Sequence, residues 1–492
     1  MSMVPGEAKT LKRSVLVGLL FLSSSIPALA QEPQPIEIGG VTFSGSIRER
    51  YEAWDFFTPT SGQNVYGFSG TQIRFGFSQT RSNLDWNIEF EAPVLLGIPD
   101  RAVRPAPQGQ LGLGGSYFAA NDNNSNTAFI FPKQAFVRFK GAHSSLRVGR
   151  FEFTDGNEVK PKDPTLVYLN SDRIAQRLIG NFGYSDVMRS LDGVQYTYAN
   201  GPWNFTAVSA IPTRGVFQVD GWGWVKTPVT YVALNRQADF GSAKAEWRVF
   251  GIFYNDDRSI LKTDNRATPA KTADLNNGID IGTYGGNIIV AAPTSAGTFD
   301  LLGWGVLQSG RWGSLTQRSG AFSAEGGWQP NFAPRLRPWI RGGYDYTSGD
   351  KNPADGTHGT FFAVLPTPRQ YNRFPFFNAM NNTDAFAEVM LRPNKKLLIR
   401  SDVHGLWLTS SSDLWYSGGG AFQPWTFGFQ GRPSNGHTKL ANLYDMSADY
   451  KFGHGVSATL YFGWAQGGQV IKAIFPTNSD GALGFVEMNY KF

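Results

Sequence analysis

Arginine and acidic side chains recur at alternate positions in several segments, where they would share one face of an extended strand. Arg48, Arg50 and Glu52 show the pattern, because residues two apart in a β-strand point to the same side. A wall of fixed arginines around water would create a positive potential that attracts anions, with carboxylates holding the guanidinium groups in place. The other interpretation is structural: charges that face each other across an enclosed space pair and rigidify the wall.

Sorting the polar face of each segment in this way gives a set of candidate residues for the inner side of the strands. The set includes acids, for example Glu91 and Asp445, but arginine stands out. For any single residue we favour the structural role. For the arginines as a group we favour an anion pathway, because a neutral solute would not need so many fixed cations. The candidate pore-lining arginines are Arg48, Arg50, Arg74, Arg138, Arg147, Arg248, Arg337, Arg341 and Arg400.

No group of residues indicates catalysis, a metal site or a cofactor. The five histidines are scattered, and only Asp402 with His404 forms a suggestive pair on one strand face, which we interpret as lumen lining. The chain has no cysteine, which excludes a disulfide scaffold, a thiolate metal site and a cysteine nucleophile. No HExxH motif or glycine-rich phosphate loop occurs. We therefore expect no enzyme, no cofactor and no metal ion.

The elements that position these faces are strands. Aromatic residues make up 14% of the 492 residues, glycine contributes 57, and charged residues are 17%, below the globular average of about 25%. Beyond the N-terminus no apolar run approaches the roughly 20 residues that a membrane helix needs. Residues 84–91 (LDWNIEFE) alternate apolar and polar throughout. With many charges on the polar faces, this pattern favours a lipid-facing wall around a wet lumen over a soluble sandwich.

About eighteen such segments occur, and an even number is typical of single-chain bacterial barrels. From the second strand on, every second connector tends to be tight, as at Ala199-Asn200-Gly201-Pro202, and the others are mostly long, notably 93–131, 154–190, 348–381 and 409–441. Short periplasmic turns that alternate with long extracellular loops predict an all-β fold, a transmembrane antiparallel up-and-down β-barrel of the outer membrane. The segments start near residues 44, 67, 84, 132, 145, 191, 202, 228, 243, 280, 297, 314, 334, 382, 395, 442, 455 and 481.

Both ends of the chain carry features of export to the outer membrane. Residues 1–30 combine a positive n-region, an apolar core at 15–22 and small residues before Gln31, so we expect a cleavable signal peptide and a barrel in 31–492. The last strand alternates apolar and polar residues and ends in Phe492, which looks like the signal read by the barrel-assembly machinery. Candidates for the aromatic girdles at the membrane interfaces are Trp54, Trp203, Trp247, Trp304 and Trp464.

Three stretches resemble the alginate-export family of outer-membrane proteins. They are residues 47–54 (IRERYEAW), residues 147–152 (RVGRFE) and, most specifically, residues 176–182 (QRLIGNF) followed by 189–194 (RSLDGV). The resemblance covers essentially the whole mature chain and implies an eighteen-stranded barrel with an arginine-lined conduit for an anionic polysaccharide. On the matching positions it implies that the conduit residues are Arg48, Arg150, Arg189 and Asp192.

The implied conduit residues have a second interpretation, an ion-pair network that holds loop 154–190 against the wall. Arg147 and Arg150 also differ in strand parity, so both can face the lumen only if the strand bulges or ends between them. One feature departs from the family. Alginate exporters are expected to have a long periplasmic turn between strands 16 and 17 that can plug the pore, and here the turn is only Phe452-Gly453-His454-Gly455.

The leading hypothesis is an outer-membrane pore that conducts an anionic poly- or oligosaccharide. The alternative is a general or anion-selective porin for small solutes such as organic acids. An adhesin or purely structural barrel is a further class. Loops 93–131 and 154–190 either fold inward and narrow the channel or stay outside, as the Asn-rich run 121–124 suggests for its own loop. Expected partners are outer-membrane lipid and an anionic solute; the net charge of +6 is too small to indicate nucleic acid.

Overall fold

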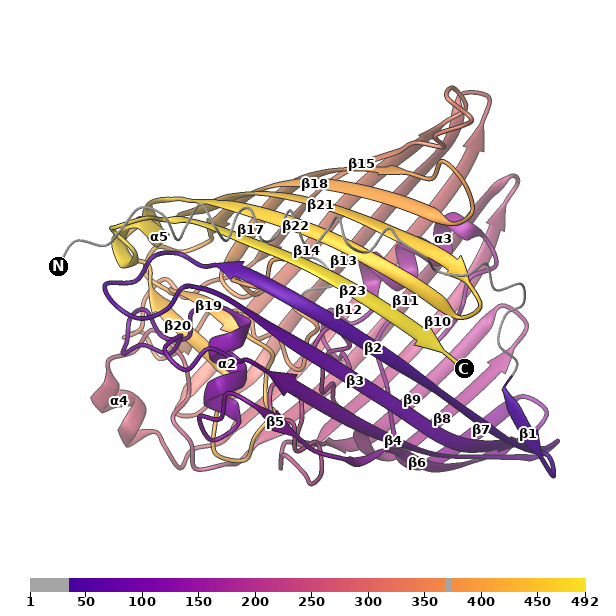
Figure 1. Cartoon of the computed structure of the whole chain (residues 1–492), viewed down its shortest axis with the longest axis horizontal. Coiled ribbons are helices and arrows are strands. Elements are labelled where there is room, and N and C mark those ends of the chain that lie inside the picture. The colour runs from indigo at the N-terminus through magenta and orange to yellow at the C-terminus, as the bar shows by residue number, and fades with distance from the viewer. Residues whose placement is uncertain (1–34, 369–372) are drawn as a thin grey trace.

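The computed structural model describes residues 35–368 and 373–492, so the signal peptide expected at 1–30 lies outside the described residues. Eighteen long strands, each antiparallel to its neighbours, form one continuous sheet (Figure 1). The sheet closes where the first of these strands pairs with the last, from Ser46 opposite Lys491 to Asp55 opposite Ala482. The barrel, its strand number and its antiparallel order are therefore as the sequence predicted.

The wall strands match the expected segments closely. The largest difference in a starting position is at the thirteenth strand, which begins at Trp339 rather than near residue 334. The wall consists of β2 (Val41–Asp55), β3 (Val65–Thr80), β4 (Leu84–Leu96), β6 (Phe131–Lys140), β7 (Ser144–Phe151), β8 (Leu191–Asn200), β9 (Trp203–Pro212), β10 (Val229–Phe240), β11 (Ala243–Asp256), β12 (Ile279–Thr294), β13 (Gly297–Trp312), β14 (Leu315–Pro330), β15 (Trp339–Thr347), β17 (Asn382–Leu391), β18 (Leu397–Leu408), β21 (Lys439–Gly453), β22 (Val456–Gly467) and β23 (Asp480–Lys491).

Short elements occupy the connectors and the N-terminal segment. Among the described residues, no helix is long and apolar enough to cross a bilayer. The short strands are β1 (Ile36–Ile38), β5 (Thr127–Ala128), β16 (Thr357–His358), β19 (Leu414–Gly418) and β20 (Phe429–Pro433). The helical pieces are α2 (Leu113–Ala120), α3 (Pro164–Tyr168), a π-helical turn η2 (Leu169–Ile174), α4 (Thr268–Ala273) and α5 (Gln469–Ile474).

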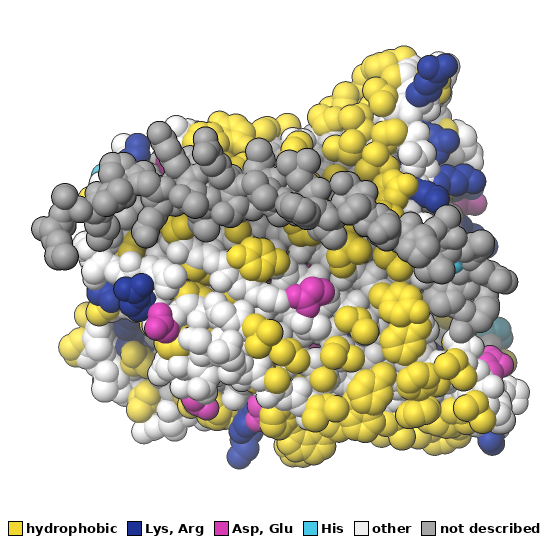
Figure 2. All heavy atoms as spheres, in the orientation of Figure 1, with side chains coloured by type: hydrophobic (Ala, Val, Ile, Leu, Met, Phe, Trp, Pro, Cys, Tyr) yellow, Lys and Arg dark blue, Asp and Glu magenta, His cyan; other side chains and the backbone are white. Residues whose placement is uncertain are grey.

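The two-residue period of the strands separates a lipid face from an inner face. In β13, Leu301 and Leu307 point outward and are 64% and 71% exposed, whereas Asp300, which directly precedes Leu301, is buried. Apolar side chains spread over much of the visible outer surface of the barrel (Figure 2). Such a surface would be unfavourable in water and is stable against lipid, as expected for an outer-membrane barrel.

The tryptophans expected in the aromatic girdles divide between the two faces of the wall. Trp203 and Trp464 lie on the outer face and are 39% and 38% exposed. Trp54 and Trp304 are buried, because they share the strand faces that carry Glu52 and Asp300, so the expectation that these two belong to a girdle is wrong. Strand parity, already present in the sequence, decides this point.

The connectors keep the expected alternation of short turns and long loops. The turn between β21 and β22 consists of His454 and Gly455 alone, so the long plugging turn is absent here. One connector on the loop side departs from the pattern: only Gly313 and Ser314 join β13 to β14. At the seam, the backbone N–H of Phe492 donates to the carbonyl of Gly45 at 3.0 Å.

Several long loops fold into the barrel. Loop 152–190 passes down the interior, where Tyr168 packs its ring 4.7 Å from that of Trp339 at the turn end of β15. It then returns and pairs in parallel with loop 348–381, with Ile179 opposite Leu365. The inward-folding alternative is thus confirmed for this loop. The external alternative is wrong for Asn121, which is buried and donates to the carbonyl of Phe217 at 2.8 Å.

Candidate functional site in the barrel lumen

Most inward arginines of the wall are neutralised by carboxylates. On β2, Arg48 pairs with Asp186 of loop 152–190 at 3.2 Å, and Arg50 pairs with Glu487 of β23 at 2.5 Å. Arg48 also donates to the backbone carbonyl of Gly183 at 2.7 Å. These contacts tie the loop to the seam of the barrel. Each of the two arginines already has an acidic partner. This favours the interpretation that they hold the wall together over the interpretation that they bind a solute.

Glu325 of β14 is the centre of a second network, which joins the loop to the opposite wall. Its carboxylate accepts two hydrogen bonds from Arg173 of η2, at 2.8 and 2.9 Å, and one from Arg177 at 3.1 Å. Arg341 of β15 donates to it at 3.0 Å and also pairs with Asp300. The side chains of Arg341 and Glu325 are completely buried. Arg341 is therefore an anchor of the wall and has no free face for a solute.

The remaining paired arginines follow the same rule. Arg248 lies 3.6 Å from Asp155 and 3.4 Å from Glu158, both at the start of loop 152–190. Arg400 pairs with Glu388 at 3.1 Å and with Asp402 at 2.8 Å across adjacent strands. The other predicted arginines with acidic partners are Arg74, bound to Glu89 and Glu152, and Arg138, bound to Asp85.

Strand register places Arg150 and Asp192 on the outer side of the wall. β7 keeps an unbroken register with β6 and β8, so Arg150 shares a face with Val148, which is 41% exposed, and Arg147 lies on the inner face. Arg150 forms a two-armed ion pair with Asp192, with both N···O distances 2.7 Å. Trp222 covers the pair from outside, 4.7 Å from the guanidinium. The expectation that Arg150 and Asp192 line the conduit is wrong, because no bulge reverses the parity.

The prediction that Arg337 lines the pore is also wrong. It is an exposed residue of the short turn 331–338 between β14 and β15, where it adopts a positive φ of 45°. The expected strand began too early, which assigned turn residues to the lumen. Arg147 does point inward, but in the described chain it has no carboxylate within ion-pair distance; it stacks on Phe151 at 4.2 Å and donates to Gln195.

Arg189 is buried without an acidic partner. Its Nη2 donates to the carbonyl of Gly419, whereas Nε and Nη1 have no hydrogen-bond partner among the described residues. Its ring neighbour is Phe182, 5.9 Å from the guanidinium carbon. Burial lowers the pKa of Arg189, because the guanidinium has lost its hydration and no carboxylate of the described chain pairs with it.

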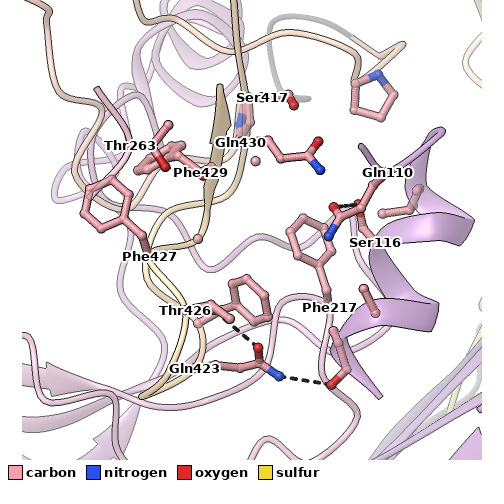
Figure 3. A pocket seen from close by; sticks show the side chains of 18 of the residues that line it. Gln110, Ser116, Phe217, Thr263, Ser417, Gln423, Thr426, Phe427, Phe429 and Gln430 are labelled. Atoms are coloured by element: carbon pink, nitrogen blue, oxygen red, sulfur yellow. Dashed lines mark hydrogen bonds between the residues drawn. The ribbon is translucent and has the colours of Figure 1, made fainter. Parts of the chain in front are cut away.

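The extracellular loops enclose a cavity of about 360 Å³ in the outer half of the lumen (Figure 3). Aromatic rings dominate its wall, among them Phe217, Phe427 and Phe429, and Figure 3 shows Gln110, Ser417 and Gln430 placing polar groups among the rings. The volume is in the range of small-molecule sites, which are mostly apolar with a few converging polar groups. Segments far apart in the chain form it, from α2 to the β19–β20 hairpin.

Arg432 is the one charged side chain in the described lining of this cavity. Its three donors bind the carbonyls of Gln108 at 3.1 Å and Gln110 at 2.7 Å and the hydroxyl of Ser417 at 3.1 Å. The guanidinium lies flat over Trp415 at 4.6 Å, and burial lowers its pKa. Neutral acceptors hold this cation in place without cancelling its charge. Sequence inspection missed it because the candidates came from the wall strands and from family motifs, whereas Arg432 lies on the short strand β20 within the connector between β18 and β21.

The described residues contain one group with metal-ligand chemistry. Asp402, His404 and Asp445 are buried, and one ligand atom from each lies within 4.8 Å of the others. The sequence had paired Asp402 with His404 as lumen lining, and the pairing on one face is confirmed. The third member comes from β21, directly opposite Asp402 in the sheet.

Comparison with solved structures shows the same architecture in outer-membrane proteins of low sequence identity. The outer membrane protein OpdK from Pseudomonas aeruginosa superposes with a TM-score of 0.54 at 8% identity, over 92% of this chain and 98% of that chain. OccAB2 from Acinetobacter baumannii gives 0.55 at 9% identity, and OccK8 (OprE) from Pseudomonas aeruginosa gives 0.52 at 11%, with the same coverage of 92% and 98%. These similarities concern the fold alone.

The sequence comparisons identify the family. No curated protein matches the chain. The profile of the family described as Alginate export matches residues 119–485, well over half of the chain. The matched region includes most of the wall strands and the inward loop 152–190. This chain therefore belongs to the alginate export family and is a β-barrel of the Gram-negative outer membrane.

Proposed function

The barrel is an outer-membrane pore, and we propose that it admits small organic anions that carry an apolar ring. The observation that supports this proposal is the cavity beneath the extracellular loops, where aromatic side chains surround Arg432, the one cation among the described lining residues. An arginine binds a carboxylate through two parallel hydrogen bonds, and aromatic walls favour a flat apolar body. A carboxylate attached to a ring would match both features at once.

The arrangement of charges supports two different roles for the arginines, a structural one and a solute-binding one. Those bound to carboxylates, such as Arg341 and Arg400, hold the wall and the inward loop together. Arg189 and Arg432 lack such partners in the described chain, so an arriving anion would relieve their unbalanced charge. Phe182, the ring beside Arg189, also lines the cavity. The two cations would thus attract the same solute.

An anionic oligosaccharide is the second candidate, because the chain belongs to the alginate export family. The geometry favours the smaller solute. Loop 152–190 occupies the interior and is bound to the wall at Glu325 and Glu388, which leaves little width for a polymer. One structure with the same fold is titled OpdK with vanillate, an aromatic carboxylate held by a similar barrel. Transport, rather than catalysis, also agrees with the family and the fold neighbours.

Single-channel recording in planar bilayers tests the proposal, with benzoate and a uronic-acid trisaccharide as probes. Benzoate should reduce the open current at saturable concentrations. Arg432→Gln should weaken this block about 10- to 100-fold, because a charge-assisted hydrogen bond contributes about 1.5–3 kcal/mol. Arg432→Lys keeps the positive charge but loses the paired N–H donors of the guanidinium. Its affinity for benzoate should lie between those of the original protein and Arg432→Gln.

Arg337→Gln is the matched control, since Arg337 is an exposed arginine of a short turn. It should leave the benzoate block unchanged. If the trisaccharide blocks the current and benzoate does not, the proposal of a small aromatic anion is refuted and the anionic oligosaccharide is favoured. An Arg432→Gln pore that binds benzoate as tightly as the original protein would refute the role of the cavity.

We further propose how the chain reaches the membrane. Residues 1–30 would direct export and be cleaved, and the final strand with Phe492 would engage the barrel-assembly machinery. The position of Phe492 at the seam supports the second point, because its backbone bonds Gly45 of the first wall strand and its ring lies 5.9 Å from that of Phe43. The strand that would carry the signal is then also the strand that closes the sheet.

A further inference from the structure

The inner face of β17, β18 and β21 concentrates carboxylates around one histidine. His404 Nδ1 donates to the carboxylate of Asp384 at 2.9 Å, and Asp402 lies two residues away on the same face of β18. Asp445 of β21 stands directly opposite Asp402 in the ladder. Like charges at such opposed positions destabilise a sheet unless a cation separates them.

Among the described residues, the arginines of the neighbourhood do not balance these acids. Arg400 is shared between Glu388 and Asp402, and it binds Asp402 through Oδ2. Arg373 of loop 348–381 acts on Asp445 only through its electrostatic field, because the described contacts include no ion pair between them. Asp384 is occupied with His404. Negative charge is therefore in excess at the centre of the group.

Two buried atoms of this group have no hydrogen-bond partner in the described structure. The side chain of His404 is 2% exposed and that of Asp402 is 3% exposed, yet His404 Nε2 and Asp402 Oδ1 make no hydrogen bond. When Nδ1 donates to Asp384, Nε2 presents its lone pair. A carboxylate that orients an imidazole in this way is the usual outer shell of a metal-binding histidine.

We propose that Asp402, His404 and Asp445 bind a divalent first-row metal ion, with Zn²⁺ as the best match. The ligand atoms lie within 4.8 Å of one another, and a tetrahedral zinc site needs separations of about 3.3 Å. Side-chain rotations within the pocket would close the difference. Three protein ligands leave the fourth position for a water molecule. Tyr461, whose hydroxyl donates to Asp445 Oδ1, would leave Oδ2 for the metal.

The donor set separates Zn²⁺ from calcium and magnesium. One imidazole nitrogen with two carboxylates suits zinc and its neighbours in the first row, whereas calcium prefers six to eight oxygen ligands and magnesium an octahedron rich in water. A bound ion would join β18 to β21 by coordination at a point where the two aspartates otherwise repel. The site is independent of the cavity and of the proposed solute.

The competing explanation is a protonated His404 that forms ion pairs with the surrounding acids. Binding measurements separate the two. Full-length mature protein, refolded in detergent with a chelator and then freed of it, should bind one Zn²⁺ per chain by calorimetry. Co²⁺ in place of zinc should give the visible absorption of a tetrahedral or five-coordinate site, which a protonated histidine cannot produce.

Ligand variants locate the site. His404→Gln and Asp445→Asn should each weaken Zn²⁺ affinity by more than about 100-fold, and Asp384→Asn by about 10- to 100-fold, the range for an outer-shell partner. His143→Gln, in the exposed turn between β6 and β7, is the matched control and should bind normally. The heat-modifiable migration of folded barrels on gels verifies that each variant has folded. Absence of stoichiometric binding to the original protein, or equal binding by folded Asp445→Asn, would overturn the proposal.

Discussion

Glu325 holds the inward loop in the barrel, and replacing it with glutamine is the most direct test of that role. Its completely buried carboxylate forms ion pairs with Arg173, Arg177 and Arg341. Glutamine has nearly the same shape but removes the negative charge that three guanidinium groups share. Arg341 keeps Asp300 and Arg177 keeps Asp345, so the loss is greatest at Arg173. Breaking a buried ion pair by neutralising one partner costs about 3–5 kcal/mol, because the other charges stay buried and unbalanced.

That loss falls on the docked position of loop 152–190, since Arg173 and Arg177 belong to the loop and Arg341 to the wall. A change of about 3–5 kcal/mol corresponds to a factor of roughly 10² to 10³ or more in the equilibrium between docked and released loop. The loop keeps further attachments, such as Tyr168 to Glu388 at 2.8 Å. We therefore expect frequent partial release rather than loss of the folded barrel.

Two measurements report release of the loop. Single-channel recordings of Glu325→Gln should show a larger mean conductance with rapid fluctuations, because part of the lumen is cleared intermittently. Limited proteolysis from the extracellular side should cut within 152–190 faster than in the original protein. Asp239→Asn is the control; Asp239 is an exposed acid near the end of β10, paired with Lys244 of β11. Unchanged conductance noise together with unchanged proteolysis would show that Glu325 is not what holds the loop.

Two other predictions concern the outer loops and the seam. Burial lowers the pKa of His358 to about 3 from 6.5, so the folded loop binds this proton more weakly than the unfolded chain, and its stability is lost as the pH falls below about 6.5. At pH 5 the loss is about 2 kcal/mol; proteolysis of loop 348–381 should accelerate between pH 7.5 and 5, and His358→Gln should remove this dependence. Phe492→Ala deletes the terminal ring that contacts Phe43 and Tyr490; it should reduce the yield of folded barrel in assembly with the purified machinery, and an undiminished yield would argue against the proposed signal.

Much of the wall follows from local sequence patterns. The alternation in 84–91 and the repeated turn residues reflect a two-residue period that any strand must have, and a lipid face leaves a strong apolar signature on every second position. The alternation of short and long connectors also indicates on which side of the membrane each loop lies. Strand parity warned correctly that Arg147 and Arg150 could not share a face unless the strand bulged or ended between them. It was not applied to Trp54, which shares the face of Glu52 and was wrongly expected in a girdle.

The site depended on contacts that no local pattern contains. Arg177 meets Asp345 across 168 positions of sequence, and Arg432 lines a cavity with residues of α2 more than 300 positions away. Asp445 joins Asp402 and His404 only because β21 pairs with β18 in one particular register. Each is a consequence of barrel closure and loop docking.

The sequence by itself therefore determined the barrel, its strand number and the face of most wall residues, because these depend on short-range periodicity and on burial against lipid. The tertiary structure alone decided which charges are cancelled and which are not. Neutralisation of an arginine depends on where a distant carboxylate comes to lie, as Glu325 does for Arg173. The arginines of the wall look alike in the sequence, and only their partners separate structural anchors from the cations left for a solute.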